Sequence, residues 1–417
     1  MHMMWWLRKN RLTIHANKVS MNLNRMMLLK LSAIVMFLVS LFLQGISQSQ
    51  SDSNSCELRI SLLTCGTGSE LYASYGHSAL RIVDTCNRQD IVYNYGTFSF
   101  SDPDFYSKFT RGKLPYYLAS ESYVGFMEIY QEEGRSVTEQ VLRLKPEDAL
   151  AVQHFLHENL KEENKYYRYD FLFDNCSTRI RDLFDKQFAH RIEWGAIIAN
   201  DSLPFRTVLD YYERNLHWER FGINLLMSDL VDQKMTSMQS MFLPDYLERG
   251  FDKATLDGNK LVGEKQELLP QGHASEIPLN EPKWYLWGLL LVIVLLSRFE
   301  KLRPLLVYFD VLLFLILGLL GLLMLFMWFG TEHKVCAWNR NLLWAFPLHV
   351  VFAALIPTKK EMVSRYAKYA SWLLVVAVLF SFFAQQKYMP EIFPLLILIY
   401  VRLGKYSKQV KYLAFNQ

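Results

Sequence analysis

A cysteine at the start of a helical pattern is the first group in this chain whose type and position could do chemistry. In "FLFDNCSTRIRDLF", residues 171–184, Cys176 comes directly after Asp174 and Asn175. The spacing of the apolar residues predicts a helix over 176–188, which either preceding residue would cap. In the first turn, the helix dipole and the free backbone N–H groups favour a thiolate and can hold an oxyanion. This position therefore predicts a nucleophilic cysteine.

A nucleophilic thiol needs a base, and His77 is the histidine best placed to supply one. Gly76 precedes it, which permits a close backbone approach, and a predicted strand follows, which gives the imidazole a rigid mount. The other histidines of the segment 50–283 fit structural roles better: His154, His157, His190 and His217. His77 is therefore predicted to be the general base.

A predicted β-hairpin brings a third polar side chain to the pair of Cys176 and His77. Residues 77–83 and 90–96 alternate in the manner of strands and flank the polar "DTCNRQ". The symmetry of this hairpin sets His77 opposite the end of the second strand, where Asn94 or Tyr95 would orient the imidazole. The result is a Cys–His–polar arrangement suited to nucleophilic catalysis.

Disulfide bonding and metal binding are the structural alternatives for the cysteines. Cys56, Cys65, Cys86 and Cys176 are an even number of cysteines in a segment that we expect to be exported, where disulfides form. Cys65 with Cys86 is a conceivable pair, and a disulfide through Cys176 stays open. A zinc site from Cys65, His77 and Cys86 has no supporting CxxC or HxxxH spacing, so neither a metal nor another cofactor is predicted.

The N-terminal residues have the pattern of a secretory signal. Basic residues continue to Lys30, the apolar run 31–43 follows, and small polar residues come next. This order predicts a signal peptide over 1–48 with cleavage near Ser47, although an uncleaved anchor stays open.

The C-terminal part is too apolar for a soluble protein. The whole chain is 51% hydrophobic and 21% charged, with a mean hydropathy of +0.04. Five apolar stretches predict a five-helix transmembrane domain over 283–404, followed by a cytoplasmic tail over 405–417. The stretches are 284–297, 304–329, 342–357, 370–384 and 391–403.

The loops between these stretches predict the orientation. One side carries eleven basic residues: Arg298, Lys301, Arg303, Lys359, Lys360, Arg365, Lys368, Arg402, Lys405, Lys408 and Lys411. The other side carries three: Lys334, Arg340 and Lys387. The positive-inside rule then predicts a multi-pass protein of the inner membrane, with its N-terminal domain in the periplasm. The net charge of +4 is small and scattered, which argues against a nucleic-acid partner.

The exported part is predicted to be an α+β domain over 49–251. Short β-rich runs precede a second β region at 135–144, and apolar residues at helical spacing predict a helix over 146–164. The polar stretch 252–282 has little periodicity and predicts a linker to the membrane part.

Three motifs carry a resemblance to a known family: "LLTCGTGSELYASYGHSALRIVD", "YNYGTFSFSDPDFYSKFTRGKLPYYL" and "YDFLFDNCSTRIRD". Together with the "LPDYL" segment and the helical tail, they closely resemble the Lnb family, the Bacteroides-type lipoprotein N-acyltransferases. A more distant resemblance links the strand-borne histidine and the "NC" helix to permuted papain-like enzymes of the NlpC/P60 and lecithin:retinol acyltransferase group.

The resemblance implies a reaction and its partners. An acyl chain of a phospholipid would pass through a thioester on Cys176 to the α-amine of a diacylglyceryl-cysteine lipoprotein, with His77 as general base. The partners would be a phospholipid donor, a diacylated lipoprotein acceptor and membrane lipid. The chemistry of the thioester fits this implication, because a thioester is more reactive toward amines than an oxygen ester.

Further residues are candidates for substrate contact. Arg111, Lys113 and Arg179 could meet a lipid phosphate, with Tyr95 beside them, although solvated or tethering charges explain the three cations equally well. Asp170 and Asp174 fit capping, or pairing with Arg179 or Arg181. In the external loop 330–344, His333, Asn339 and Asn341 are expected near the membrane face.

Two other functions stay open. A periplasmic cysteine hydrolase acting on cell-wall peptides would use the same groups, although a polar soluble substrate does not need a large membrane domain. A non-catalytic assembly or transport protein would work through its membrane helices. Against transport, Asp310 is the one charged residue in the interior of the apolar stretches, whereas ion paths commonly carry several.

Overall fold

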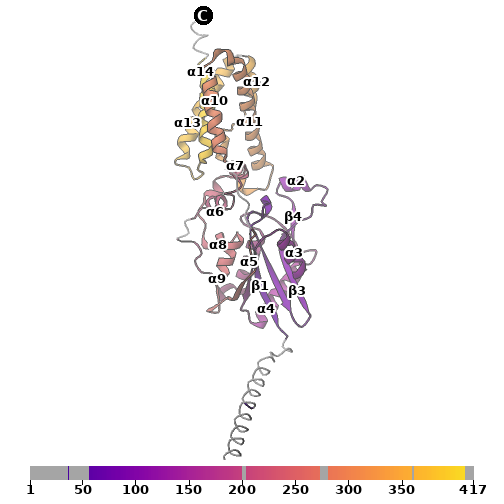
Figure 1. The fold of residues 1–417 in the computed structure, drawn as a ribbon. Helices are drawn as coiled ribbons and strands as arrows, with labels where there is room; N and C mark the ends of the chain where they lie inside the picture. The colour runs from indigo at the N-terminus through magenta and orange to yellow at the C-terminus, as the bar shows by residue number, and fades with distance from the viewer. Residues whose placement is uncertain (1–35, 37–55, 200–202, 273–279, 359–360, 409–417) are drawn as a thin grey trace, which may run out of the picture. The chain divides into compact units, whose positions relative to one another are not determined.

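The computed structural model describes residues 36, 56–199, 203–272, 280–358 and 361–408. Within this part of the chain, the N-terminal region is rich in β-structure and the C-terminal region is helical (Figure 1). The predicted mixture of helices and strands is therefore confirmed. The predicted signal peptide, 1–48, lies outside the described residues except for Met36.

A seven-stranded antiparallel sheet organises the N-terminal region, in the order β10-β5-β1-β2-β3-β4-β6. Its strands are β1 Leu58–Cys65, β2 His77–Asp84, β3 Gln89–Thr97, β4 Pro115–Ser122, β5 Val137–Leu142, β6 Tyr166–Arg168 and β10 Val262–Leu269. The predicted hairpin is present as β2 and β3, in which Leu80 pairs with Tyr93.

Apolar side chains on both faces of the central strands explain why helices cover the sheet on both sides. Leu62, Leu80 and Tyr93 point into one apolar core, whereas their neighbours Leu63 and Val92 point into another. Because successive strand residues face opposite ways, both faces must be buried. Helices α4 Pro146–Asn159, α5 Cys176–Phe188 and α9 Pro244–Lys253 contribute to the first core, and α3 Tyr123–Glu132 covers the second.

Smaller elements complete the region. The helices are α2 Phe105–Thr110, α6 Phe205–Tyr212, α7 His217–Leu226 and α8 Ser237–Ser240. A second sheet has the order β7-β8-β9, with β7 Ile192–Glu193, β8 Thr255–Leu256 and β9 Asn259–Lys260. Residues 255–269 thus belong to the two sheets, although the sequence predicts a linker over 252–282.

The C-terminal helices are α10 Pro282–Leu296, α11 Arg303–Phe329, α12 His349–Leu355, α13 Glu361–Ser381 and α14 Phe393–Ser407. Among the described residues, the helical segments 300–329 and 361–381 are long and apolar enough to cross a membrane, and 282–296 and 349–358 are shorter apolar helices. The predicted count of five membrane-spanning helices stays a prediction. Close packing within the group relies on glycine: a Cβ on Gly321 would lie 2.0 Å from the Ala345 carbonyl oxygen.

A buried ion network ties three strands of the large sheet. The Arg81 guanidinium on β2 lies 2.6 Å from an Asp90 oxygen on β3 and 3.1 Å from a Glu139 oxygen on β5. It also stacks 3.4 Å from the centroid of the Tyr123 ring. The Glu139 side chain is only 1% exposed, so its charge depends on this pairing.

We expect Glu139→Ala to destabilise the protein by about 3 kcal/mol, because it leaves a buried guanidinium short of an acceptor. The measurement is the midpoint of thermal unfolding of the full chain in detergent. Lys161→Ala, which removes a solvent-exposed ion pair with Glu158, is the matched control and should leave the midpoint unchanged. Equal midpoints for the two variants would contradict the structural role of Glu139.

Candidate functional site

Cys176 is the first residue of α5, as the sequence predicts. Asn175 caps the helix: its side-chain oxygen accepts a hydrogen bond from the Thr178 backbone N–H at 2.9 Å, and the Thr178 hydroxyl accepts one from the Asn175 N–H at 2.7 Å. This reciprocal capping box fixes the start of the helix and leaves the first-turn N–H groups close to the sulfur. Cys176 itself is partly exposed.

His77 begins β2, and the residue before it must be glycine. Gly76 has φ +78°, and a Cβ there would lie 2.6 Å from the Cys65 carbonyl oxygen. The tight turn brings the His77 side chain against Cys176, with which it is hydrogen-bonded. The sequence favours His77 over the other histidines because a glycine precedes it, and the backbone conformation at Gly76 requires that glycine.

Asn94 and Glu121 extend this contact into a chain of four side chains. His77 Nε2 lies 3.0 Å from Asn94 Oδ1, so the other ring nitrogen, Nδ1, is the one left to meet the sulfur. The Asn94 amide nitrogen donates in turn to Glu121 Oε1 at 2.6 Å. Four neighbouring elements, α5, β2, β3 and β4, therefore supply one residue each.

The charges of the pair are mutually stabilised. Burial alone would raise the pKa of the Cys176 thiol, but the charge and hydrogen bond of His77 outweigh it and bring that pKa below its usual value. Burial alone would lower the pKa of His77, but the Cys176 thiolate and the Asn94 hydrogen bond raise it. Both shifts favour a thiolate–imidazolium pair, which is the reactive form of a cysteine nucleophile.

Backbone and hydroxyl donors surround the sulfur. The Ser78 backbone N–H donates to it, and the Ser177 hydroxyl lies 3.9 Å away and 3.0 Å from the Ser78 hydroxyl. Gly96, with φ +89°, faces Cys176: a Cβ on it would lie 3.8 Å from the cysteine Cβ. N–H groups at the start of a helix, beside a nucleophile, can stabilise an oxyanion.

The states of the cysteines exclude three of the sequence-based alternatives. Cys56 and Cys86 are disulfide-bonded, whereas Cys65, Cys176 and Cys336 are free thiols. The Cys65–Cys86 pairing, one of the possibilities that the sequence leaves open, is therefore wrong, and Cys176 is not in a disulfide. A zinc site using Cys86 is also wrong, because a disulfide sulfur is not a thiolate ligand. In the described part of the chain, no group of three or more His, Cys, Asp or Glu side chains is placed to hold a metal.

A hollow of about 940 Å³ lies beside the site, and we call it the Arg179 hollow. Residues before and after Cys176 line one side of it, including Asp174 and Arg179, and residues of the α11 end and the following loop line the other, including Trp328 and Lys334. Cys176 and His77 are not among its lining residues. Tyr169, which lines it, interacts electrostatically with Cys176 and stacks on Tyr116 at 4.4 Å.

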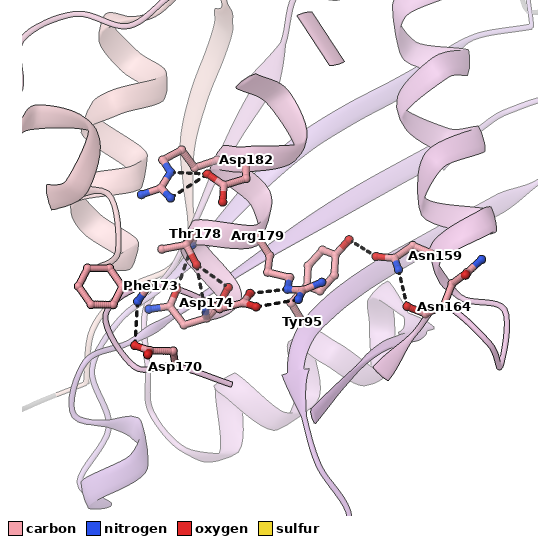
Figure 2. A network of polar contacts seen from close by, with 11 residues as sticks. Tyr95, Asn159, Asn164, Asp170, Phe173, Asp174, Thr178, Arg179 and Asp182 are labelled. Atoms are coloured by element: carbon pink, nitrogen blue, oxygen red, sulfur yellow. Dashed lines mark hydrogen bonds and ion pairs between the residues drawn. The ribbon is translucent and has the colours of Figure 1, made fainter. Parts of the chain in front are cut away.

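Ion pairs neutralise the charges that line the Arg179 hollow. Arg179 makes a two-pronged contact with Asp174, at 2.6 and 2.8 Å, as Figure 2 shows. Arg168 lies 3.1 Å from Glu332, and Lys334 lies 3.4 Å from Asp170. The expected pairing of Asp174 with Arg179 is confirmed. Most of the cations in this hollow thus already have a carboxylate partner.

Of the four residues predicted to contact substrate, two line the Arg179 hollow and two do not. Tyr95 is 2% exposed, and its hydroxyl donates to Asn159 at 2.6 Å (Figure 2). Its side chain also lines the hollow. Arg111 and Lys113 are exposed outside the hollow, where Lys113 lies 3.9 Å from Glu332. Only Tyr95 and Arg179 of this set line the hollow. Substrate contact by any of the four stays a prediction.

The external-loop residues tie the membrane part to the exported part. The His333 ring nitrogen Nε2 lies 3.1 Å from the Thr110 carbonyl oxygen. The side-chain amides of Asn339 and Asn341 both donate to the Leu225 carbonyl, at 2.8 and 3.0 Å. Structural hydrogen bonds therefore account for the two asparagines, whereas His333 also lines the hollow.

Sequence reasoning missed Ser78, Glu121 and Tyr169. Ser78 follows His77 directly, so its N–H could have been placed near the sulfur once β2 was paired with α5. Glu121 and Tyr169 carry no local signal, because they reach the site only through the pairing of β4 with β3 and through the fold of residues 169–175.

The pKa shifts predict selective alkylation. Thiolates react with iodoacetamide, so Cys176, whose pKa is lowered, should be modified at lower pH than the other free thiols, because burial raises the pKa of Cys65 to about 12 and that of Cys336 to about 11. His77→Gln removes the positive charge that lowers the Cys176 pKa, so its alkylation profile should move to higher pH. Mass spectrometry of each cysteine across pH is the measurement; an unmoved profile would show that His77 does not act on the thiol.

Comparison with known proteins agrees with this architecture. A family model described as the Lnb N-terminal periplasmic domain matches residues 47–209, and one described as the Lnb transmembrane domain matches residues 274–412. No curated protein and no solved structure matches the chain. The two matches identify a membrane protein with a periplasmic N-terminal part, and the chain belongs to the Lnb family.

Proposed function

We propose that this protein is a lipoprotein N-acyltransferase that carries an acyl chain on Cys176. The observation that carries the proposal is the Cys176–His77–Asn94 arrangement beside a hollow bordered by the end of α11. A hollow that lies between the helix of the nucleophile and the end of a long apolar helix suits a donor that resides in lipid. We further propose that the protein is a multi-pass protein of the inner membrane, with a permuted papain-like catalytic domain over 49–251 joined to a membrane domain over 283–404.

The first half-reaction forms the thioester. The Cys176 thiolate attacks the ester carbonyl of a phospholipid, and the developing oxyanion is held by N–H groups at the start of α5. The intermediate expels the lysophospholipid alkoxide, which takes its proton from the His77 imidazolium. The products are an acyl thioester on Cys176, a lysophospholipid and a neutral imidazole.

The second half-reaction forms the amide. The neutral α-amine of a diacylglyceryl-cysteine lipoprotein attacks the thioester, and His77 accepts the proton that the nitrogen loses. Collapse of the intermediate releases the Cys176 thiolate and the triacylated lipoprotein. Asn94 keeps the imidazole directed at the sulfur in both halves, which makes it a positioning residue.

The other two functions have less support. A cysteine hydrolase would use the same groups with water as acceptor, but the border formed by Trp328 and the α11 end suits a lipid more than a cell-wall peptide. For a transporter, the buried carboxylate of Asp310 on α11 would have to be free to bind an ion. It is instead held by Arg402, at 2.5 and 2.8 Å, and by the Tyr406 hydroxyl at 2.6 Å.

Cys176→Ser should abolish N-acylation while leaving the protein folded, because a serine hydroxyl beside His77 is not ionised near neutral pH. The measurement is mass spectrometry of lipoprotein N-termini in a host without its own N-acyltransferase, where the variant should give a free amine and a mass lower by one acyl chain. Cys336→Ser, which removes a buried free thiol that does not line the Arg179 hollow, should keep full triacylation. Triacylation by the Cys176 variant would exclude the thioester mechanism, and a peptide cleavage product would favour the hydrolase.

Asn94→Ala should lower kcat by roughly 10- to 100-fold, since a hydrogen bond to a charged group contributes about 1.5–3 kcal/mol. Asn94→Asp keeps an acceptor for His77 but sets two carboxylates against each other at the Glu121 contact. Adding Glu121→Gln should then restore much of the activity, because the glutamine amide can donate to the aspartate. Failure of the double variant to exceed Asn94→Asp would show that the Asn94–Glu121 contact does not position His77.

A further inference from the structure

A second cavity, remote from the cysteine, lies at the far ends of the C-terminal helices. It has a volume of about 800 Å³ and is formed by the connection between α10 and α11 together with parts of α13 and α14. Five basic side chains line it, and we call it the basic pocket. These side chains are Arg303, Lys368, Arg402, Lys405 and Lys408.

The place of the basic pocket follows from the direction of the chain. Helix α10 begins at Pro282, directly after the exported part, and ends at Leu296, so the connection to α11 lies at the end away from that part. Helix α14 runs the same way and ends at Ser407. The pocket therefore lies at the end that the positive-inside rule assigns to the cytoplasm.

Little of the positive charge in the basic pocket is neutralised. The only acidic residue in its lining is Glu300. Asp310, behind the lining, is engaged by the Arg402 guanidinium at 2.5 and 2.8 Å. Lys405 Nζ is 3.5 Å from Asp310 Oδ2 and has no hydrogen-bond partner among the described residues, although it is buried.

The three remaining cations of the lining lack a carboxylate partner. Arg303, Lys368 and Lys408 are exposed, and none has an ion-pair partner within 4.0 Å in the described part of the chain. Counting Arg402 with Asp310 as one neutral pair leaves four cations against Glu300, an excess of three positive charges. Positive charge that serves only to orient a membrane protein can be scattered, whereas this charge converges on one cavity.

The rest of the lining is suited to a lipid. The hydroxyls of Ser297, Ser371 and Ser407 add hydrogen-bonding groups near the cations. Trp372 and Tyr400, which are 64% and 52% exposed, give the pocket an aromatic side on surfaces of α13 and α14 that would face acyl chains. A cluster of cations next to exposed apolar surface is the combination that recognises an anionic headgroup still attached to its chains.

We propose that the basic pocket binds the phosphate of an anionic phospholipid from the cytoplasmic leaflet. The excess positive charge favours a lipid with net negative charge over a zwitterionic one, because the latter brings its own cation. This site is separate from the proposed acyl donor site: the Arg179 hollow lies at the exported end, and its cations are mostly paired. The lipid of the basic pocket would hold the helix ends together and is not consumed.

Native mass spectrometry of the full chain in detergent tests the proposal. The probes are phosphatidylglycerol and phosphatidylcholine with identical acyl chains, and we expect the first to be retained at least tenfold better. Lys368→Gln/Lys408→Gln removes two exposed cations of the lining and should abolish the preference without disturbing the Asp310 network. Arg303→Gln/Lys405→Gln should also abolish the preference, although it removes the Lys405 contact with Asp310.

Arg298→Gln/Lys301→Gln is the matched control, because it removes two basic residues of the same connection that do not line the pocket. It should keep the preference, as should Cys176→Ser, which separates this proposal from the catalytic one. Equal retention of the two lipids by the unaltered protein, or equal loss in the control and the lining variants, would overturn the proposal. Displacement of the lipid by millimolar inorganic phosphate would also overturn it, in favour of a site for free phosphate.

Discussion

The Cys176 sulfur lies at the edge of an apolar core, and the His77 imidazole beside it favours the thiolate form there. Burial acts against both charged forms, so neither group would hold its charge without the other. The contact needs α5 to begin at residue 176 and β2 to begin at residue 77. The capping box of Asn175 and the left-handed turn at Gly76 satisfy these two requirements. The geometry of the site thus depends on the residues at which α5 and β2 begin.

Local signals were sufficient to predict much of this arrangement. The apolar spacing after Cys176 predicts α5 with the bounds that it has, and the alternation around "DTCNRQ" predicts the hairpin that brings Asn94 to His77. Glu121 could not be predicted in the same way. It comes to the site because Val92 and Asn94 on β3 pair with Glu121 and Ala119 on β4, across a connection whose length and path the sequence does not reveal.

Exposure explains where the sequence pattern misleads. Strand β10, "VGEKQELL", lies at the edge of the sheet and is mostly exposed, so it shows no apolar alternation and resembles a linker. The cysteines mislead for another reason: Cys65 is buried in the second core and free, while Cys86 is disulfide-bonded. In the sequence the two cysteines look equally suited to form a disulfide bond, because the number and spacing of cysteines do not encode which of them pair.

At one end of the helical region most basic side chains are paired with carboxylates, and at the other end most are not. This difference affects how the acyl donor would bind. In the Arg179 hollow, Arg179 is held by both oxygens of Asp174 and lies 3.7 Å from the Tyr167 ring centroid, so a phosphate would meet a guanidinium whose charge a carboxylate already neutralises. A weakly held headgroup suits a donor that must leave as a lysophospholipid after each turnover, since tight binding of the product would slow its release. In the basic pocket three of the five cations, Arg303, Lys368 and Lys408, have no ion-pair partner among the described residues, which suits a lipid that stays. We therefore expect the selection of the donor to depend on access of its ester to Cys176 more than on the charge of its headgroup.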